Sequence, residues 1–86
     1  MAIVTLRYWA AAKQAAGIAE QTVTADTLAD ALAAAGGQAD QDEGLRAVLA
    51  RSSFLLDGLP VGSRAPEHVA VTDGAIIEVL PPFAGG

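Results

Sequence analysis

The residues best suited to chemistry form the end of the chain, which reads Leu80-Pro81-Pro82-Phe83-Ala84-Gly85-Gly86. Proline has no backbone N–H to donate, so the proline pair ends a strand and keeps the following segment extended. Glycine has no side chain, so the two final glycines allow the backbone to pass through a narrow channel and bring a terminal carboxylate to a reactive centre. The pattern predicts that the chain acts through the α-carboxylate of Gly86. The alternative is a frayed terminus without a function.

The other side chains offer little catalytic chemistry. The chain has no cysteine and a single histidine, His68, which excludes a disulfide framework, cysteine zinc sites and thiol nucleophiles. His68 lies in no nucleophile motif or metal-ligand spacing, and we expect it on the surface. Asp40, Asp42 and Glu43 are typical of a helix start, where acids favour the helix dipole. We therefore expect no bound cofactor and no metal site on this chain.

Composition limits the classes of partner. The 86 residues are 52% hydrophobic and 17% charged, which predicts one small globular domain. Ten acidic and five basic residues give a net charge of −5, the wrong sign for binding nucleic acid and a sign that favours a basic protein surface. The sequence contains neither an apolar run of membrane-spanning length nor a signal-peptide pattern. We expect a cytoplasmic protein with no membrane or nucleic-acid partner.

The first half of the sequence predicts two strands and two helices. Residues 3–9 alternate as in a half-buried strand, with Val4, Leu6 and Tyr8 on one face. An alanine-rich segment then predicts a short helix over 10–16. A second strand is expected over 20–24. A capping-box pattern follows at Thr27 and Asp30 and predicts the start of the main helix, which ends at the glycine pair 36–37.

The second half predicts a further helix and three strands. Asp40 followed by Glu43 predicts the cap of this helix, and its apolar stripe extends to Ala50 through Leu45, Val48 and Leu49. A strand is expected over 53–57, a turn over 58–60, a short edge segment from Val61 and a last strand over 75–80. This order predicts an α+β fold of the β-grasp, or ubiquitin-like, architecture, with a mixed sheet and one main helix packed across it. The first and last strands would lie side by side in the middle of the sheet, with a domain over 1–80 and a flexible Gly-Gly tail over 81–86.

The tail resembles the terminus of the small sulfur-carrier subunit of molybdopterin synthase, the MoaD type, within a family that also includes the thiamin sulfur carrier ThiS. The resemblance extends over the whole chain. It includes the aromatic pair Tyr8-Trp9, the alanine-rich turn ending at Gly17, the helix start at 27–32, Leu56-Asp57-Gly58 and Asp73-Gly74. The chain departs from many relatives at Ala12-Lys13-Gln14, where they carry Arg followed by Glu.

The resemblance implies a carrier mechanism in which the catalytic groups lie on other proteins. An enzyme related to ubiquitin E1 would use ATP to adenylate Gly86, and a sulfur donor would displace AMP to leave a thiocarboxylate. Activation is needed because the resting carboxylate is anionic at neutral pH and inert toward sulfur. The tail would then insert into a MoaE-type large subunit and give its sulfur to a cyclic pterin precursor, forming the dithiolene. The residues expected to insert are Pro81, Pro82, Phe83, Ala84 and Gly85.

A partner interface is expected on the sheet face that points away from the core. If the first strand buries Val4, Leu6 and Tyr8, its other face is open to solvent. The residues predicted to share that face are Arg7, Trp9, Leu55 and Leu80. Clustered large side chains on an open face indicate an interface, whereas isolated ones do not. A shift of one residue in strand parity would reverse these assignments.

Three other functions remain open. A protein modifier would join Gly86 to lysine amines, and Lys13 is the only lysine in the chain, which disfavours chains of linked copies. A sulfur carrier for thiamin or cysteine synthesis would use the same tail with a different acceptor. A plain interaction module would not use the tail at all.

Overall fold

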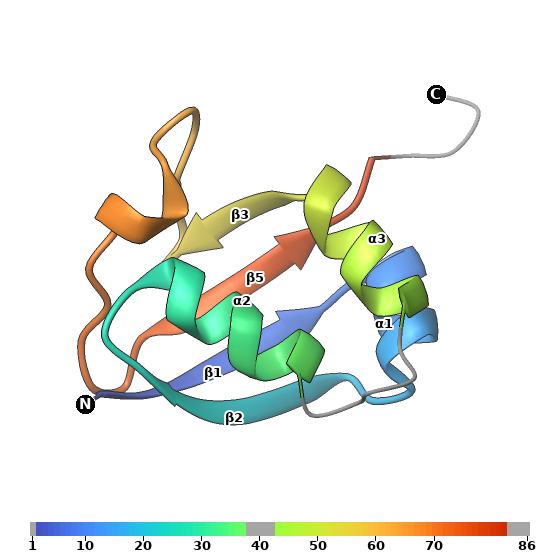
Figure 1. The fold of residues 1–86 in the computed structure, drawn as a ribbon, viewed down its shortest axis with the longest axis horizontal. Coiled ribbons are helices and arrows are strands. Elements are labelled where there is room, and N and C mark those ends of the chain that lie inside the picture. Colours follow the sequence, from blue (N-terminus) through green and yellow to red (C-terminus); the bar gives the residue numbers. More distant parts are fainter. Residues whose placement is uncertain (1, 38–42, 83–86) are drawn as a thin grey trace.

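The computed structural model describes residues 2–37 and 43–82. A five-stranded sheet has the strand order β2-β1-β5-β3-β4, and the helices pack on one of its faces (Figure 1). The strands are β1 (Ala2–Tyr8), β2 (Glu20–Ala25), β3 (Ser53–Leu56), β4 (Leu59–Pro60) and β5 (Ile76–Leu80). The helices are α1 (Ala10–Ala16), α2 (Leu28–Gly37), α3 (Glu43–Arg51) and the short 3-10 helix η1 (Pro66–His68).

The first and last strands lie side by side in the middle of the sheet, as predicted. β1 runs parallel to β5 and antiparallel to β2, while β3 runs antiparallel to both β5 and β4. The parity predicted for β1 is confirmed, because Val4, Leu6 and Tyr8 are all buried in the core. Ile77 and Val79 of β5 are buried on the same side. Because the side chains of a strand alternate between its faces, the other face of the sheet carries the remaining residues.

Helix α2 begins at the predicted cap and packs on β2 and the core. The Oγ1 of Thr27 accepts a hydrogen bond from the backbone N–H of Asp30 (3.2 Å), and the Asp30 carboxylate accepts one from the N–H of Asp26 (3.4 Å). The N–H of Leu28 donates to the carbonyl of Val69 (2.8 Å), which ties the helix start to the segment after η1. Leu28 is fully buried. The amphipathic face of α2 therefore closes the core over one half of the sheet.

The turn predicted over residues 58–60 is wrong. The turn is the pair Asp57-Gly58, and both residues have positive φ (50° and 84°), as a type I′ hairpin turn requires. Leu59–Pro60 then forms β4, and Pro60 pairs with Leu55 at the edge of the sheet, where proline is tolerated. The predicted strand over 53–57 accordingly ends at Leu56.

The first strand is one residue shorter than predicted at its carboxyl end. Trp9 lies outside β1 and is the N-cap residue of α1, although its backbone is still extended (φ −117°, ψ 148°). The N–H of Trp9 donates to the carbonyl of Val79 (3.3 Å), and its carbonyl accepts from the N–H of Ala12 (3.0 Å). Ala10 has φ of +50°, a backbone conformation that glycine usually adopts. The change of direction at Ala10 therefore has no glycine to indicate it in the sequence.

Candidate functional site

The tail leaves the sheet from its central region. β5 lies between β1 and β3 and ends at Leu80, at the end of the sheet where α1 and α3 pack (Figure 1). Pro81 is buried and Pro82 is exposed. The remaining predicted site residues lie outside the described part of the chain: Phe83, Ala84, Gly85 and Gly86. The structure therefore describes the base of the tail and the platform beneath it.

The last residues of β5 are held from both sides. On one side Val79 pairs with Tyr8 of β1, and on the other it pairs with Phe54 of β3. Leu80 pairs with Ser53, so the β3 ladder continues to the residue before the first proline. A segment that follows such a strand starts from a fixed position and direction. The tail function predicted from the sequence would need such a fixed starting point.

The face of the sheet opposite the helices is named here the open face. Its described side chains are exposed or half-buried: Ile3, Thr5, Arg7, Glu20, Thr22, Thr24, Ser53, Leu55, Ile76, Glu78 and Leu80. The set combines apolar and charged groups, with the larger apolar groups of β3 and β5 near the tail. Large apolar groups clustered on an exposed face are the usual composition of a protein-binding surface.

Three of the four predicted interface residues lie on the open face. Arg7 and Leu55 belong to one row across the sheet, because each pairs with Glu78 of β5. Leu80 lies two residues further along β5 and is half-buried, next to the tail. Trp9 lies just beyond β1, is 48% exposed, and lines a shallow hollow together with Arg7. The structure thus brings these residues together at the tail end, and their binding role stays a prediction.

Glu78 and Ile3 are among the residues of this surface that were not predicted from the sequence. Glu78 is half-buried in the middle strand, and Ile3 is 53% exposed on β1. The signal for Glu78 was its spacing of two residues from Leu80, which places both side chains on one face of a strand. The signal for Ile3 was its position between the buried residues Ala2 and Val4.

Arg7 has an ionic partner on the open face. Its Nε lies 3.4 Å from Oε2 of Glu20 on β2, and the two side chains are 46% and 58% exposed. An exposed pair of this kind contributes little to stability. It does orient the guanidinium toward β2, away from the strand that carries the tail.

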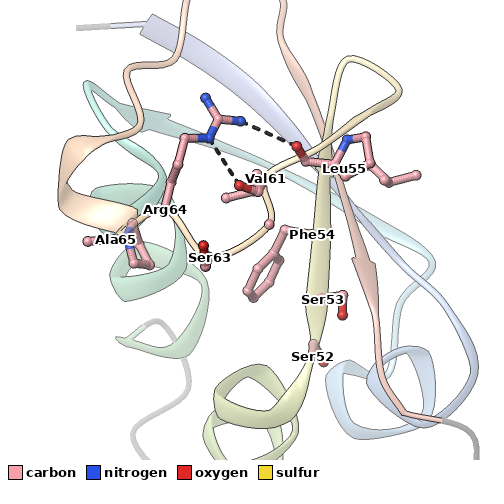
Figure 2. A pocket seen from close by; sticks show the side chains of 11 residues that line it. Ser52, Ser53, Phe54, Leu55, Val61, Ser63, Arg64 and Ala65 are labelled. Atoms are coloured by element: carbon pink, nitrogen blue, oxygen red, sulfur yellow. Dashed lines mark hydrogen bonds between the residues drawn. The ribbon is translucent and has the colours of Figure 1, made fainter.

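A hollow of about 410 Å³ beside β3 carries no catalytic constellation among its described lining residues (Figure 2). Its charged side chain is Arg64, whose guanidinium donates to the carbonyls of Val61 (3.0 Å) and Pro60 (3.4 Å). Phe54 and small residues such as Ser63 form much of the remaining wall. These groups include no acid or base that could be paired for proton transfer.

The described residues also contain no group of three His, Cys, Asp or Glu side chains placed to hold a metal ion. Asp40 and Asp42 fall in the segment that is not described. His68 is exposed in η1. Within residues 2–37 and 43–82, no helix is both long enough and apolar enough to cross a membrane.

Comparisons with solved structures identify the fold. Small archaeal modifier protein 1 from Methanosarcina acetivorans superposes with a TM-score of 0.83 at 21% identity, covering 100% of this chain and 98% of that one. The same modifier from Haloferax volcanii gives 0.78 at 22% identity, covering 98% and 99%. The chain has the β-grasp fold. Subunit 1 in the complex of subunits 1 and 2 of molybdopterin-converting factor from Helicobacter pylori gives 0.69 at 24% identity, covering 98% and 99%.

The predicted α+β, β-grasp architecture is thereby confirmed. No protein-family model matches the chain, and a search of curated proteins found no significant match. At the sequence identities above, what the chain shares with these structures is the fold.

Proposed function

We propose that this protein is a ubiquitin-like sulfur carrier and the small subunit of a molybdopterin synthase, with Gly86 as the site that carries sulfur. The observation that carries the proposal is the tail. A Pro-Pro pair followed by Phe-Ala-Gly-Gly continues a central strand that is paired on both sides. The fold is the one found in molybdopterin-converting factor subunit 1, which supports this reading over that of a frayed terminus.

The proposed sulfur loading takes place at the carboxyl group of Gly86 in two steps. In the first, a carboxylate oxygen attacks the α-phosphorus of ATP on an E1-like enzyme, which forms an acyl adenylate and releases pyrophosphate. In the second, hydrosulfide, or a donor at the same oxidation level, attacks the acyl carbon. The C–O bond to AMP breaks, and a thiocarboxylate, AMP and a proton are left. ATP and every acid or base would be bound by the partners.

The proposed acceptor complex contains a large subunit of the MoaE type. The Helicobacter pylori relative was solved as a complex of subunits 1 and 2, which supports a protein partner for this chain. Residues 81–85 would enter the large subunit, and Arg7, Trp9, Leu55 and Leu80 would contact its surface. Each loaded carrier would deliver one sulfur atom to the cyclic pterin precursor, and water would cleave the bond between the Gly86 acyl carbon and that sulfur to leave a carboxylate at Gly86.

A protein modifier is the second candidate, because the modifiers from Methanosarcina acetivorans and Haloferax volcanii superpose with higher TM-scores than the Helicobacter pylori subunit does. In that case a lysine ε-amine of a target protein attacks the acyl adenylate, forms an amide with Gly86 and releases AMP. A carrier for thiamin or cysteine synthesis would share the thiocarboxylate and differ only in the acceptor.

Intact-mass spectrometry separates these functions. Protein ending at Gly86 is incubated with an E1-like enzyme, ATP and sulfide, and then with the large subunit and the cyclic pterin precursor. We expect a mass gain equal to one sulfur minus one oxygen atom, which is lost again when the pterin acceptor is added. A variant lacking Gly86 is the control and should gain no sulfur.

Two outcomes would overturn the proposal. Attachment of the chain to lysines of other proteins, without any sulfur gain, would establish the modifier instead. The second outcome is that the thiocarboxylate loses its sulfur to a thiazole-forming or cysteine-forming system and not to the large subunit and pterin. That result would assign the chain to thiamin or cysteine synthesis.

A further inference from the structure

Glu78 is a carboxylate on the open face whose neighbours on β3 and β5 are apolar. It lies in the middle of the open face, with β1 on one side of its strand and β3 on the other. Along β5 its neighbours on the same face are Ile76 and Leu80, and across the sheet Leu55 lies beside it. Glu78 is already half-buried in the isolated chain. A partner that covers this face would remove the remaining water from the carboxylate.

The cation nearest in register to Glu78 is directed elsewhere. Arg7 is the lateral partner of Glu78 on β1, yet its guanidinium pairs with Glu20 on the far side of β1. Among residues 2–37 and 43–82, no cationic side chain forms an ion pair with Glu78. Burial of a carboxylate without a paired cation is strongly unfavourable. A partner that covered this face without offering a cation to Glu78 would bury an uncompensated charge.

We propose that Glu78 is the specificity-determining residue of the open face, and that it selects a large-subunit surface in which an Arg or Lys is surrounded by apolar side chains. The inference rests on the proposed function and adds the chemistry of the partner's surface to it. The apolar groups Leu55, Leu80 and Ile76 would contribute contact area. Glu78 would discriminate between partners, because a surface with an acid or an apolar group at this position would bury an uncompensated charge.

A second copy of this chain fits the face less well. The cation that a second open face could offer to Glu78 is Arg7, and Arg7 is already paired with Glu20. The net charge of −5 on each copy also opposes their approach. These charges favour a basic partner over self-association.

The test measures the affinity of the full chain for the large subunit by calorimetry. Glu78→Gln keeps the size of the side chain and removes its charge, and it should weaken binding by about tenfold or more. Glu67→Gln is the matched control, because Glu67 is an exposed acid in η1, away from the open face, and it should change the affinity less than about twofold. Glu78→Arg should weaken binding further, and replacing the opposing basic residue of the large subunit by Glu should restore it. Thermal unfolding of each variant checks that the fold is kept.

The sulfur-loading assay separates failure of this inference from failure of the proposed function, because the mass gain at Gly86 does not depend on Glu78. If the wild-type chain binds the large subunit and Glu78→Gln binds equally tightly, the inference is wrong and the carrier function stands. If the wild-type chain gains sulfur but does not bind the large subunit, the inference also falls, and the acceptor must be another protein. If it neither gains sulfur nor binds, both proposals fall.

Discussion

The backbone of Trp9 is held by hydrogen bonds, whereas its side chain is exposed to solvent. Its N–H donates to Val79 and its carbonyl accepts from Ala12, so the main chain is held at the junction of β1 and α1. The indole is nevertheless 48% exposed. Aromatic side chains exposed next to other large groups are frequent energetic centres of interfaces. The side chain of Trp9 can therefore be replaced without removing the contacts that position the chain here.

We predict that Trp9→Glu weakens binding to the large subunit by at least ~tenfold while changing the free energy of unfolding by less than ~1 kcal/mol. The measurements are calorimetric affinity and denaturant unfolding of the same samples. Leu59→Glu is the matched control, since Leu59 is 70% exposed on the edge strand β4, and it should bind as the wild type does. Equal affinities for Trp9→Glu and wild type would remove Trp9 from the interface.

The turn of the β3–β4 hairpin is tied to the start of β5 through Asp57. The carboxylate Oδ1 of Asp57 accepts a hydrogen bond from the N–H of Ile76 (2.9 Å), and the N–H of Asp57 donates to the carbonyl of Ile76 (2.8 Å). Asp57 also adopts φ of +50°, a conformation that Asp and Asn tolerate better than Ala. The turn residue thus orients both the hairpin and the start of the strand that leads to the tail.

Asp57→Ala should lower the free energy of unfolding by about 1–3 kcal/mol, through the lost acceptor and the strained conformation. Asp57→Asn keeps a side-chain oxygen and the tolerance of positive φ, so its loss should be within ~0.5 kcal/mol. Urea unfolding of the three proteins gives both values. A loss for Asn as large as that for Ala would show that the negative charge, and not the geometry, is what matters.

Elements with a regular alternation of apolar and polar residues could be predicted from the sequence. Elements that exist only because they pair with a neighbouring strand could not. The alternation through Val4, Leu6 and Tyr8 is long enough to define which face of β1 is buried. β4 has two residues, Leu59–Pro60, too few for any period, so its existence depends on the turn before it. The end of β1 was misplaced because Ala10 reverses the chain with no local sequence signal.

The residues of the candidate site can also be separated into those that the sequence predicts and those that it does not. The base of the tail could be found from its residue types, since a Pro-Pro pair ends a strand wherever it occurs. Arg7, Leu55 and Leu80 could be assigned to one face because parity follows from alternation. The central position of Glu78 could not, because it depends on the register between β5 and its two neighbours, which only the three-dimensional pairing defines.

At the scale of the whole molecule, the net charge would determine how the protein approaches the proposed large subunit. A charge of −5 on 86 residues creates a field that attracts a basic surface before contact. Salt shortens the range of that field, from about 10 Å at 0.1 M to about 3 Å at 1 M. Electrostatic attraction acts mainly on the rate of association, whereas contacts on the open face act mainly on the rate of dissociation.

We therefore predict that the rate of association with the large subunit falls about tenfold or more between low salt and ~0.5 M salt, with a smaller change in the dissociation rate. Stopped-flow mixing measures the rate of association, and surface plasmon resonance measures the rate of dissociation. Glu67→Lys makes the net charge less negative without altering the open face, and it should reduce the low-salt association rate and its dependence on salt. An association rate that does not respond to salt would contradict electrostatic steering.

The parallel pairing of β1 and β5 also determines how the molecule responds to a mechanical load. The chain enters the sheet at the start of β1 and leaves it at the end of β5, on opposite sides of the molecule (Figure 1). Tension between these two points pulls the neighbouring strands along each other, so the hydrogen bonds between them are strained together and not broken one after another. A partner that pulled on the tail while the start of β1 was held would therefore load the hydrogen bonds between β1 and β5 together.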